Sequence, residues 1–194
     1  MKRFVPSFLH EVFGERQSFG IMVFILSFGV ATASLIFIFY PEMAVGLPLW
    51  QTFLAWLLVM DIASGNLANF TASTNHYYAA GPESRRQLFI AVHVHLPAIS
   101  LLLEVGLHIA LLIWFYTVVG AFIVIGKGGE AQKLWGGSLI CAGITIVLMI
   151  PTSIFPPYMQ IISLLFIVKV IYSFGVNHYD NESFVQKKKG DPAL

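Results

Sequence analysis

Two charged residues, Asp61 and Lys169, stand inside long apolar stretches of the sequence. A charged side chain in the hydrocarbon of a membrane is costly, so such residues mark ion pathways, proton relays or buried ion pairs. A carboxylate there requires a cation, a proton or water. Lys169 can supply the cation, or its long side chain can reach the nearby membrane surface instead. The two residues therefore predict either a buried ion pair or a carboxyl group that binds a proton or an ion.

Two histidines, His93 and His95, lie in another apolar stretch. Imidazole changes its charge near neutral pH, so both rings are candidates for proton or ion handling. On a regular helix, side chains at this spacing point about 200° apart, so the two rings cannot chelate one metal ion together. Pro97 removes the helical hydrogen-bond partner of the His93 carbonyl, which predicts a kink there.

Two amide side chains lie between Asp61 and the C-terminal end of its apolar stretch. Asn66 and Asn69 follow Asp61, and residues 71–78 read Thr-Ala-Ser-Thr-Asn-His-Tyr-Tyr. This polar segment is either an entrance to the site or an interfacial loop whose tyrosines belong to the aromatic belt of a membrane protein. The small residues between Asp61 and Asn69 also favour close packing of two helices.

Metal and cofactor sites have little support in the sequence. Glu104 and His108 lie one helical turn apart, a spacing compatible with a metal ion or with a hydrogen-bonded pair. We prefer to place them in a tight external hairpin and therefore predict no metal site. Cys141 is the only cysteine, so no internal disulfide and no cysteine zinc site can form. The sequence identifies no cofactor.

The elements that carry these residues are predicted from hydropathy, because a membrane helix needs about 20 mainly apolar residues. Residues 20–40 and 47–70 form two apolar runs, and residues 135–151 and 158–175 form two more. Residues 88–126 are about twice too long for one span. A break between Glu104 and His108 makes two short spans, and one long broken helix is the alternative. We predict an all-α, polytopic integral membrane bundle of six transmembrane helices.

The basic residues predict how this bundle is oriented, because cytoplasmic loops accumulate Lys and Arg. With six spans, every Lys and Arg except Lys169 falls on one side: Lys2, Arg3, Arg16, Arg85, Arg86, Lys127, Lys133 and residues 187–189. Both termini are therefore predicted to be cytoplasmic. The chain then divides into an N-terminal cytoplasmic or interfacial segment (1–19), a transmembrane domain (20–175) and a cytoplasmic tail (176–194). Apolar residues near helical spacing in the first segment indicate either a short amphipathic helix or a frayed end.

The composition excludes several classes of protein. Of the 194 residues, 57% are hydrophobic and 11% are charged, far from the roughly 25% charge of a soluble domain. The net charge of +1, without a basic stripe, gives no reason to expect nucleic acid as a partner. The lipid bilayer is the expected partner, and the chain can also form a homo-oligomer or join a membrane complex. The predicted location is the plasma (cell inner) membrane.

Three functions remain. The first is a small transporter or channel subunit that moves protons, ions or a small solute through Asp61, His93 and Lys169. The second is an intramembrane enzyme acting on a lipid or isoprenoid, with a histidine and Asp61 as acid and base, either with or without a metal. The third is a structural subunit of a membrane complex. No nucleophile with its base is identifiable, which favours transport.

Cysteine labelling tests the predicted topology. Cysteines introduced near Arg85, Lys133 and Lys188 should be labelled only from the cytoplasm, because the basic loops are predicted to lie there. Cysteines near Glu42 and Ser153 should be labelled only from outside. Labelling of Arg85 and Lys133 from opposite sides would contradict the six-span topology.

Overall fold

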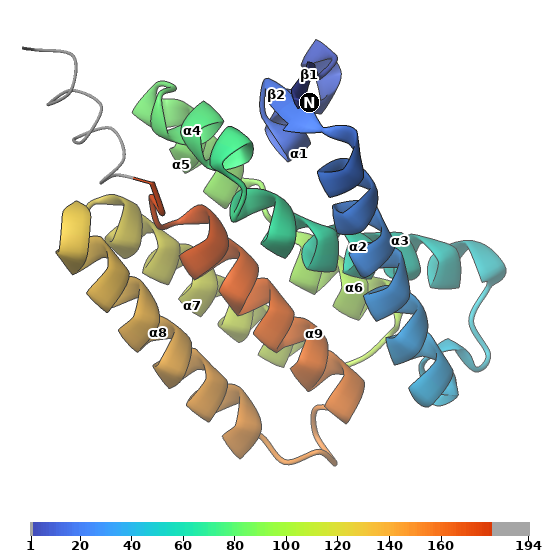
Figure 1. The fold of residues 1–194 in the computed structure, drawn as a ribbon. Helices are drawn as coiled ribbons and strands as arrows, with labels where there is room; N and C mark the ends of the chain where they lie inside the picture. Colours follow the sequence, from blue (N-terminus) through green and yellow to red (C-terminus); the bar gives the residue numbers. More distant parts are fainter. Residues whose placement is uncertain (1, 180–194) are drawn as a thin grey trace, which may run out of the picture.

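The computed structural model describes residues 2–179, which form a bundle of helices with one short two-stranded ribbon (Figure 1). Within these residues, four helical stretches are long and apolar enough to cross a membrane. They are α2 (Phe19–Phe39), α7 (Leu107–Ile125), α8 (Gly129–Met149), and α9 (Pro157–Ile167) continued by the π-helix η3 (Val168–Phe174). The protein thus has the apolar helices of a membrane protein.

A fifth candidate span is bent. Helix α3 (Leu49–Asn69) is followed by α4 (Ala72–Ala79), and the two meet at an angle of 85°. Together they pass the same test of length and hydropathy, either as a broken span or as a re-entrant loop. The described residues therefore contain four to five candidate spans, and the predicted count of six is not confirmed.

The difference lies in the predicted third span, which is not one helix. It consists of α5 (Glu83–Ala91) and α6 (His95–Leu102), and each is too short to cross a membrane. The break falls where Pro97 was expected to disturb the helix, because proline cannot donate a hydrogen bond to the His93 carbonyl. That carbonyl instead accepts a hydrogen bond from Trp114 Nε1 at 2.9 Å. The helix is interrupted there rather than merely kinked.

The predicted break before His108 is confirmed. Helix α6 ends at Leu102 and α7 begins at Leu107. Between them Glu104 and Gly106 have φ values of 55° and 58°, so the chain turns in the left-handed region and cannot continue as a helix. One long helix across residues 88–126 is therefore excluded.

The loops gather at two opposite ends of the bundle. At one end, Arg86 Nη2 donates to the carbonyls of Phe174 and Gly175, and Asn75 Nδ2 donates to the carbonyl of Val176. At the other end, Phe155 lies against Gly106. The helix η2 (Pro41–Ala44) follows α2 at this second end, where Tyr40 contacts Tyr158. The side of the membrane that each end faces stays a prediction.

The most buried span is α9 with η3, which packs against α3, α7 and α8. Many large apolar side chains of α2, α7 and α8 point outward instead, as expected where helices contact lipid; Phe24, Leu112 and Leu148 are more than half exposed. The core therefore surrounds the stretch that contains Lys169.

The N-terminal segment is folded, and it is neither one continuous amphipathic helix nor a frayed end, the two alternatives that the sequence left open. Strands β1 (Lys2–Phe4) and β2 (Arg16–Ser18) pair antiparallel, and η1 (Ser7–Leu9) and the four-residue α1 (His10–Phe13) lie between them. The segment docks on α4: Thr74 Oγ1 donates to the Val12 carbonyl and Tyr78 Oη to the Glu11 carbonyl, each at 3.0 Å. It covers the end of the bundle at which α3 bends into α4.

Candidate functional site

Asp61 and Lys169 form an ion pair between α3 and η3. Lys169 Nζ lies 2.5 Å from Asp61 Oδ2 and also donates to the Asp61 backbone carbonyl at 3.2 Å. The Lys169 residue is only 3% exposed, so its side chain does not reach the bundle surface. Of the two predicted alternatives for Lys169, the structure has the buried pair.

The local fold explains how Lys169 reaches Asp61. Lys169 is the second residue of the π-helix η3, a type of turn that is frequent at functional sites. Gly65 leaves room for the lysine stem, because a Cβ atom there would lie 2.4 Å from Lys169 Cε. Any larger residue at position 65 would displace Lys169.

Asn66 does not face Asp61 but holds the helix that carries Lys169. Its Nδ2 donates to the Leu165 carbonyl at 2.9 Å, and its Oδ1 accepts from Ser173 Oγ at 3.1 Å. These two bonds tie α3 to α9 and η3 on both sides of Lys169. Asn66 is therefore a positioning residue.

His95 contacts the same carboxylate oxygen as Lys169. Its Nε2 lies 2.9 Å from Asp61 Oδ2. A carboxylate only accepts hydrogen bonds, so Nε2 carries the proton, and Nδ1 of the neutral ring has a free lone pair. This Nδ1 is buried and has no hydrogen-bond partner within residues 2–179.

His93 adds a second unsatisfied nitrogen. Its Nδ1 donates to the Phe89 carbonyl at 2.6 Å, which leaves Nε2 as the lone-pair nitrogen of the neutral ring. This Nε2 is likewise buried without a partner among the described residues. The His93 and His95 rings have centroids 5.0 Å apart. The helix break between α5 and α6 thus brings together two histidines that a regular helix would hold on opposite faces.

These side chains line a cavity of about 200 Å³. The Asp61 side chain is 45% exposed whereas that of Lys169 is 4% exposed, so the carboxylate faces open space and the ammonium lies behind it. Asn69 also lines the cavity, as do Glu11 and Val12 of the N-terminal segment. Such a volume is large enough for several water molecules or a small solute.

Other residues singled out in the sequence lie elsewhere. Glu104 and His108 are exposed at the turn between α6 and α7, and Cys141 is exposed on α8. Within residues 2–179, no three His, Cys, Asp or Glu side chains are grouped as metal ligands would be.

Some contributors to the site were not predicted. Trp114 fixes the His93 carbonyl, and Glu11 and Val12 come from a segment expected only at the surface. Gly65 was interpreted as a packing residue, although its role here is to admit Lys169. A tryptophan in an apolar run usually marks an interface, so the sequence offered no signal for Trp114.

Comparisons with known proteins give no further guide to the function. No protein-family model, no curated protein and no solved structure matches this chain. The interpretation of the site therefore depends on its own chemistry.

The ion pair makes a specific prediction for stability. Asp61→Asn should lower the free energy of unfolding in detergent by about 3 to 5 kcal/mol, because it leaves the Lys169 ammonium buried without a counter-charge. Lys169→Met should cost less, since Asp61 keeps His95 and the cavity. The double variant Asp61→Asn/Lys169→Met should recover most of the loss, because neither charge is left alone.

Glu104→Gln is the matched control, since it removes an exposed carboxylate at the far end of the bundle and should change stability by less than about 0.5 kcal/mol. Thermal unfolding of the four variants measures these effects. Equal losses for Asp61→Asn and for the double variant would show that the two charges are not coupled.

Proposed function

We propose that this protein is a small membrane transporter or channel subunit in which Asp61, Lys169 and His95 bind and release a proton. The observation that carries the proposal is the competition of two donors for one oxygen: Lys169 Nζ and His95 Nε2 both contact Asp61 Oδ2. An oxygen that is shared by two donors binds each of them more weakly than it would bind a single donor. The relative strength of the two contacts therefore depends on the charges of Lys169 and His95.

A proton arriving from the cavity has an acceptor in His95 Nδ1, because this nitrogen has a free lone pair. Protonation of His95 makes its hydrogen bond to Asp61 charge-assisted and therefore stronger. It also places a second cation beside Lys169, and the two cations repel each other. Both effects weaken the contact between Lys169 and Asp61.

Weakening this contact acts on the helix that carries Lys169. A π-helix lacks the tighter hydrogen-bond geometry of an α-helix, so η3 depends on its tertiary contacts to persist. Loss of the ion pair removes one of these contacts, while the Asn66 bonds remain. We infer that proton binding releases the Lys169 side chain from Asp61, while the Asn66 bonds keep η3 against α3.

The main alternative is an intramembrane enzyme, which one observation favours. A histidine hydrogen-bonded to a carboxylate, as His95 is to Asp61, is the arrangement of a general base that activates water. A lipid or isoprenoid substrate would then be hydrolysed in the cavity. Liposomes of defined lipid separate the two functions, since an enzyme changes the lipid composition and a transporter does not.

Proton flux measures the proposed activity. Protein reconstituted into liposomes that contain a pH-sensitive dye should carry protons when a potassium diffusion potential is applied. The Asp61→Asn/Lys169→Met variant should fold yet lose flux by more than about tenfold, because no carboxylate remains to organise the relay. His95→Gln should also lose flux, since glutamine can donate to Asp61 but cannot take up a proton.

Glu104→Gln should retain the flux of the unmodified protein and serves as the control. Unchanged flux in a folded Asp61→Asn/Lys169→Met variant would refute the proposed role of the cluster. It would leave the ion pair with a purely structural function.

A further inference from the structure

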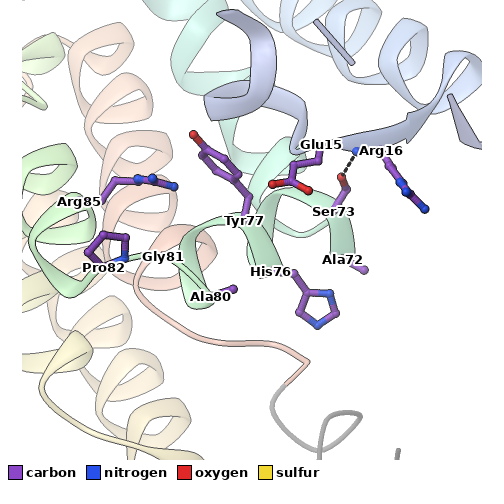
Figure 2. A pocket seen from close by; sticks show the side chains of 10 residues that line it. All are labelled: Glu15, Arg16, Ala72, Ser73, His76, Tyr77, Ala80, Gly81, Pro82 and Arg85. Atoms are coloured by element: carbon purple, nitrogen blue, oxygen red, sulfur yellow. Dashed lines mark hydrogen bonds between the residues drawn. The ribbon is translucent and has the colours of Figure 1, made fainter. Parts of the chain in front are cut away.

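A second pocket lies outside the candidate site, where the N-terminal segment meets α4 and α5. It has a volume of about 730 Å³ and is lined by residues of three segments: Glu15 and Arg16, then the exposed side of α4, then the turn that leads to Arg85 (Figure 2). A hydrogen bond from the Arg16 backbone N–H to Ser73 Oγ, 3.2 Å long, holds the N-terminal segment against α4 at its edge. The pocket is therefore part of the folded structure rather than a gap between independent segments.

The pocket lies where a membrane surface is expected. Helix α4 turns by 85° from α3, so it runs across the end of the bundle instead of along it. Beside it, three aromatic side chains of the N-terminal segment and the start of α2 are largely exposed: Phe4, Phe8 and Phe19. Exposed aromatic residues at the end of apolar helices are typical of the lipid headgroup region. The natural neighbour of this pocket is a phospholipid.

The pocket is lined by one carboxylate, Glu15, and by two guanidinium groups, Arg16 and Arg85; the Arg16 guanidinium lies over the Phe4 ring, and no ion pair joins the three side chains. The Arg85 guanidinium stacks on the Tyr77 ring with its carbon 4.8 Å from the ring centroid. No carboxylate among the described residues lies within ion-pair distance of Arg85, and no cation within that distance of Glu15. In Figure 2 the Arg85 and Glu15 side chains reach toward Tyr77 from opposite sides, and Arg16 points away from them.

We propose that this pocket binds the phosphoethanolamine headgroup of a membrane phospholipid. The planar guanidinium of Arg85 matches a phosphate, to which it can donate two parallel hydrogen bonds. The Glu15 carboxylate accepts hydrogen bonds from an ammonium group, which has three donors. A choline headgroup has no N–H donor for Glu15, and a glycerol headgroup offers Glu15 neutral hydroxyl donors without the positive charge of an ammonium. The pocket therefore favours the ethanolamine lipid over both.

Lipid binding to the purified protein tests this assignment. Native mass spectrometry in detergent, with phosphatidylethanolamine, phosphatidylcholine and phosphatidylglycerol of identical acyl chains, should give the highest occupancy for phosphatidylethanolamine. Arg85→Gln should weaken binding of this lipid by about tenfold, the effect of losing a charge-assisted pair. Glu15→Gln should instead abolish the preference for ethanolamine over choline while keeping binding to both lipids.

Two control variants lie outside the pocket. Lys133→Gln removes a cation of α8, and Glu83→Gln removes a carboxylate of α5 that accepts a hydrogen bond from Gln87 Nε2. Both should bind phosphatidylethanolamine as the unmodified protein does. If Arg85→Gln unfolds, Arg85→Lys replaces it; it retains the charge without the planar fork and should weaken binding less.

Competition with soluble compounds distinguishes the source of the headgroup. Free phosphoethanolamine should displace the lipid at high concentration, and inorganic phosphate should do so less well. Tighter binding of free phosphoethanolamine than of the lipid would identify a soluble ligand and overturn the lipid assignment. Equal occupancy by the three lipids, or an Arg85→Gln variant that binds like Lys133→Gln, would overturn the site itself.

Discussion

A lysine ammonium at the centre of an apolar bundle must be neutralised by the protein, because the surrounding hydrocarbon supplies no counter-charge. Lys169 is in this position, and Asp61 is its partner at 2.5 Å. Two neighbouring residues serve this contact: Gly65 leaves room for the lysine stem, and Asn66 joins α3 to α9 and η3 on both sides of Lys169. The pair also binds α3 to the most buried span of the bundle.

The ion pair is not closed off from its surroundings. The Asp61 side chain lines a cavity, and Asp61 Oδ2 contacts both Lys169 and His95. Because both histidines use one ring nitrogen to contact the protein, each keeps a lone-pair nitrogen for a proton or for water. Glu11 and Val12 of the N-terminal segment line this cavity. Glu15 and Arg16 of the same segment line the second pocket, which contains Arg85. A headgroup bound in the pocket with Arg85 would hold the N-terminal segment in place. The lipid composition would then affect the access of protons to Asp61.

The contact between Asp61 and Lys169 was one of the two alternatives that the sequence left open, whereas the predicted count of six spans is not confirmed. Charged residues in apolar stretches are rare and costly, so Asp61 and Lys169 stood out, and the structure places them in contact. The turn near Glu104 was also predictable, because a stretch twice the length of a span must break. The third span was not, since hydropathy cannot distinguish one helix from two short helices that meet at His93. Its break depends on Pro97 and on Trp114, which lies 21 residues from His93 in the sequence. The π-helix η3 was not predicted either, because no local pattern of residues indicates it.

Solid-state NMR of the protein in a lipid bilayer can measure the contact between Asp61 and Lys169. With ¹³C at the Asp61 carboxylate and ¹⁵N at Lys169 Nζ, we expect a strong dipolar coupling, the chemical shift of an ionised carboxylate, and the shift of a charged ammonium. A carboxyl group that is protonated at neutral pH, or an ammonium without coupling to Asp61, would show that the two groups do not form an ion pair.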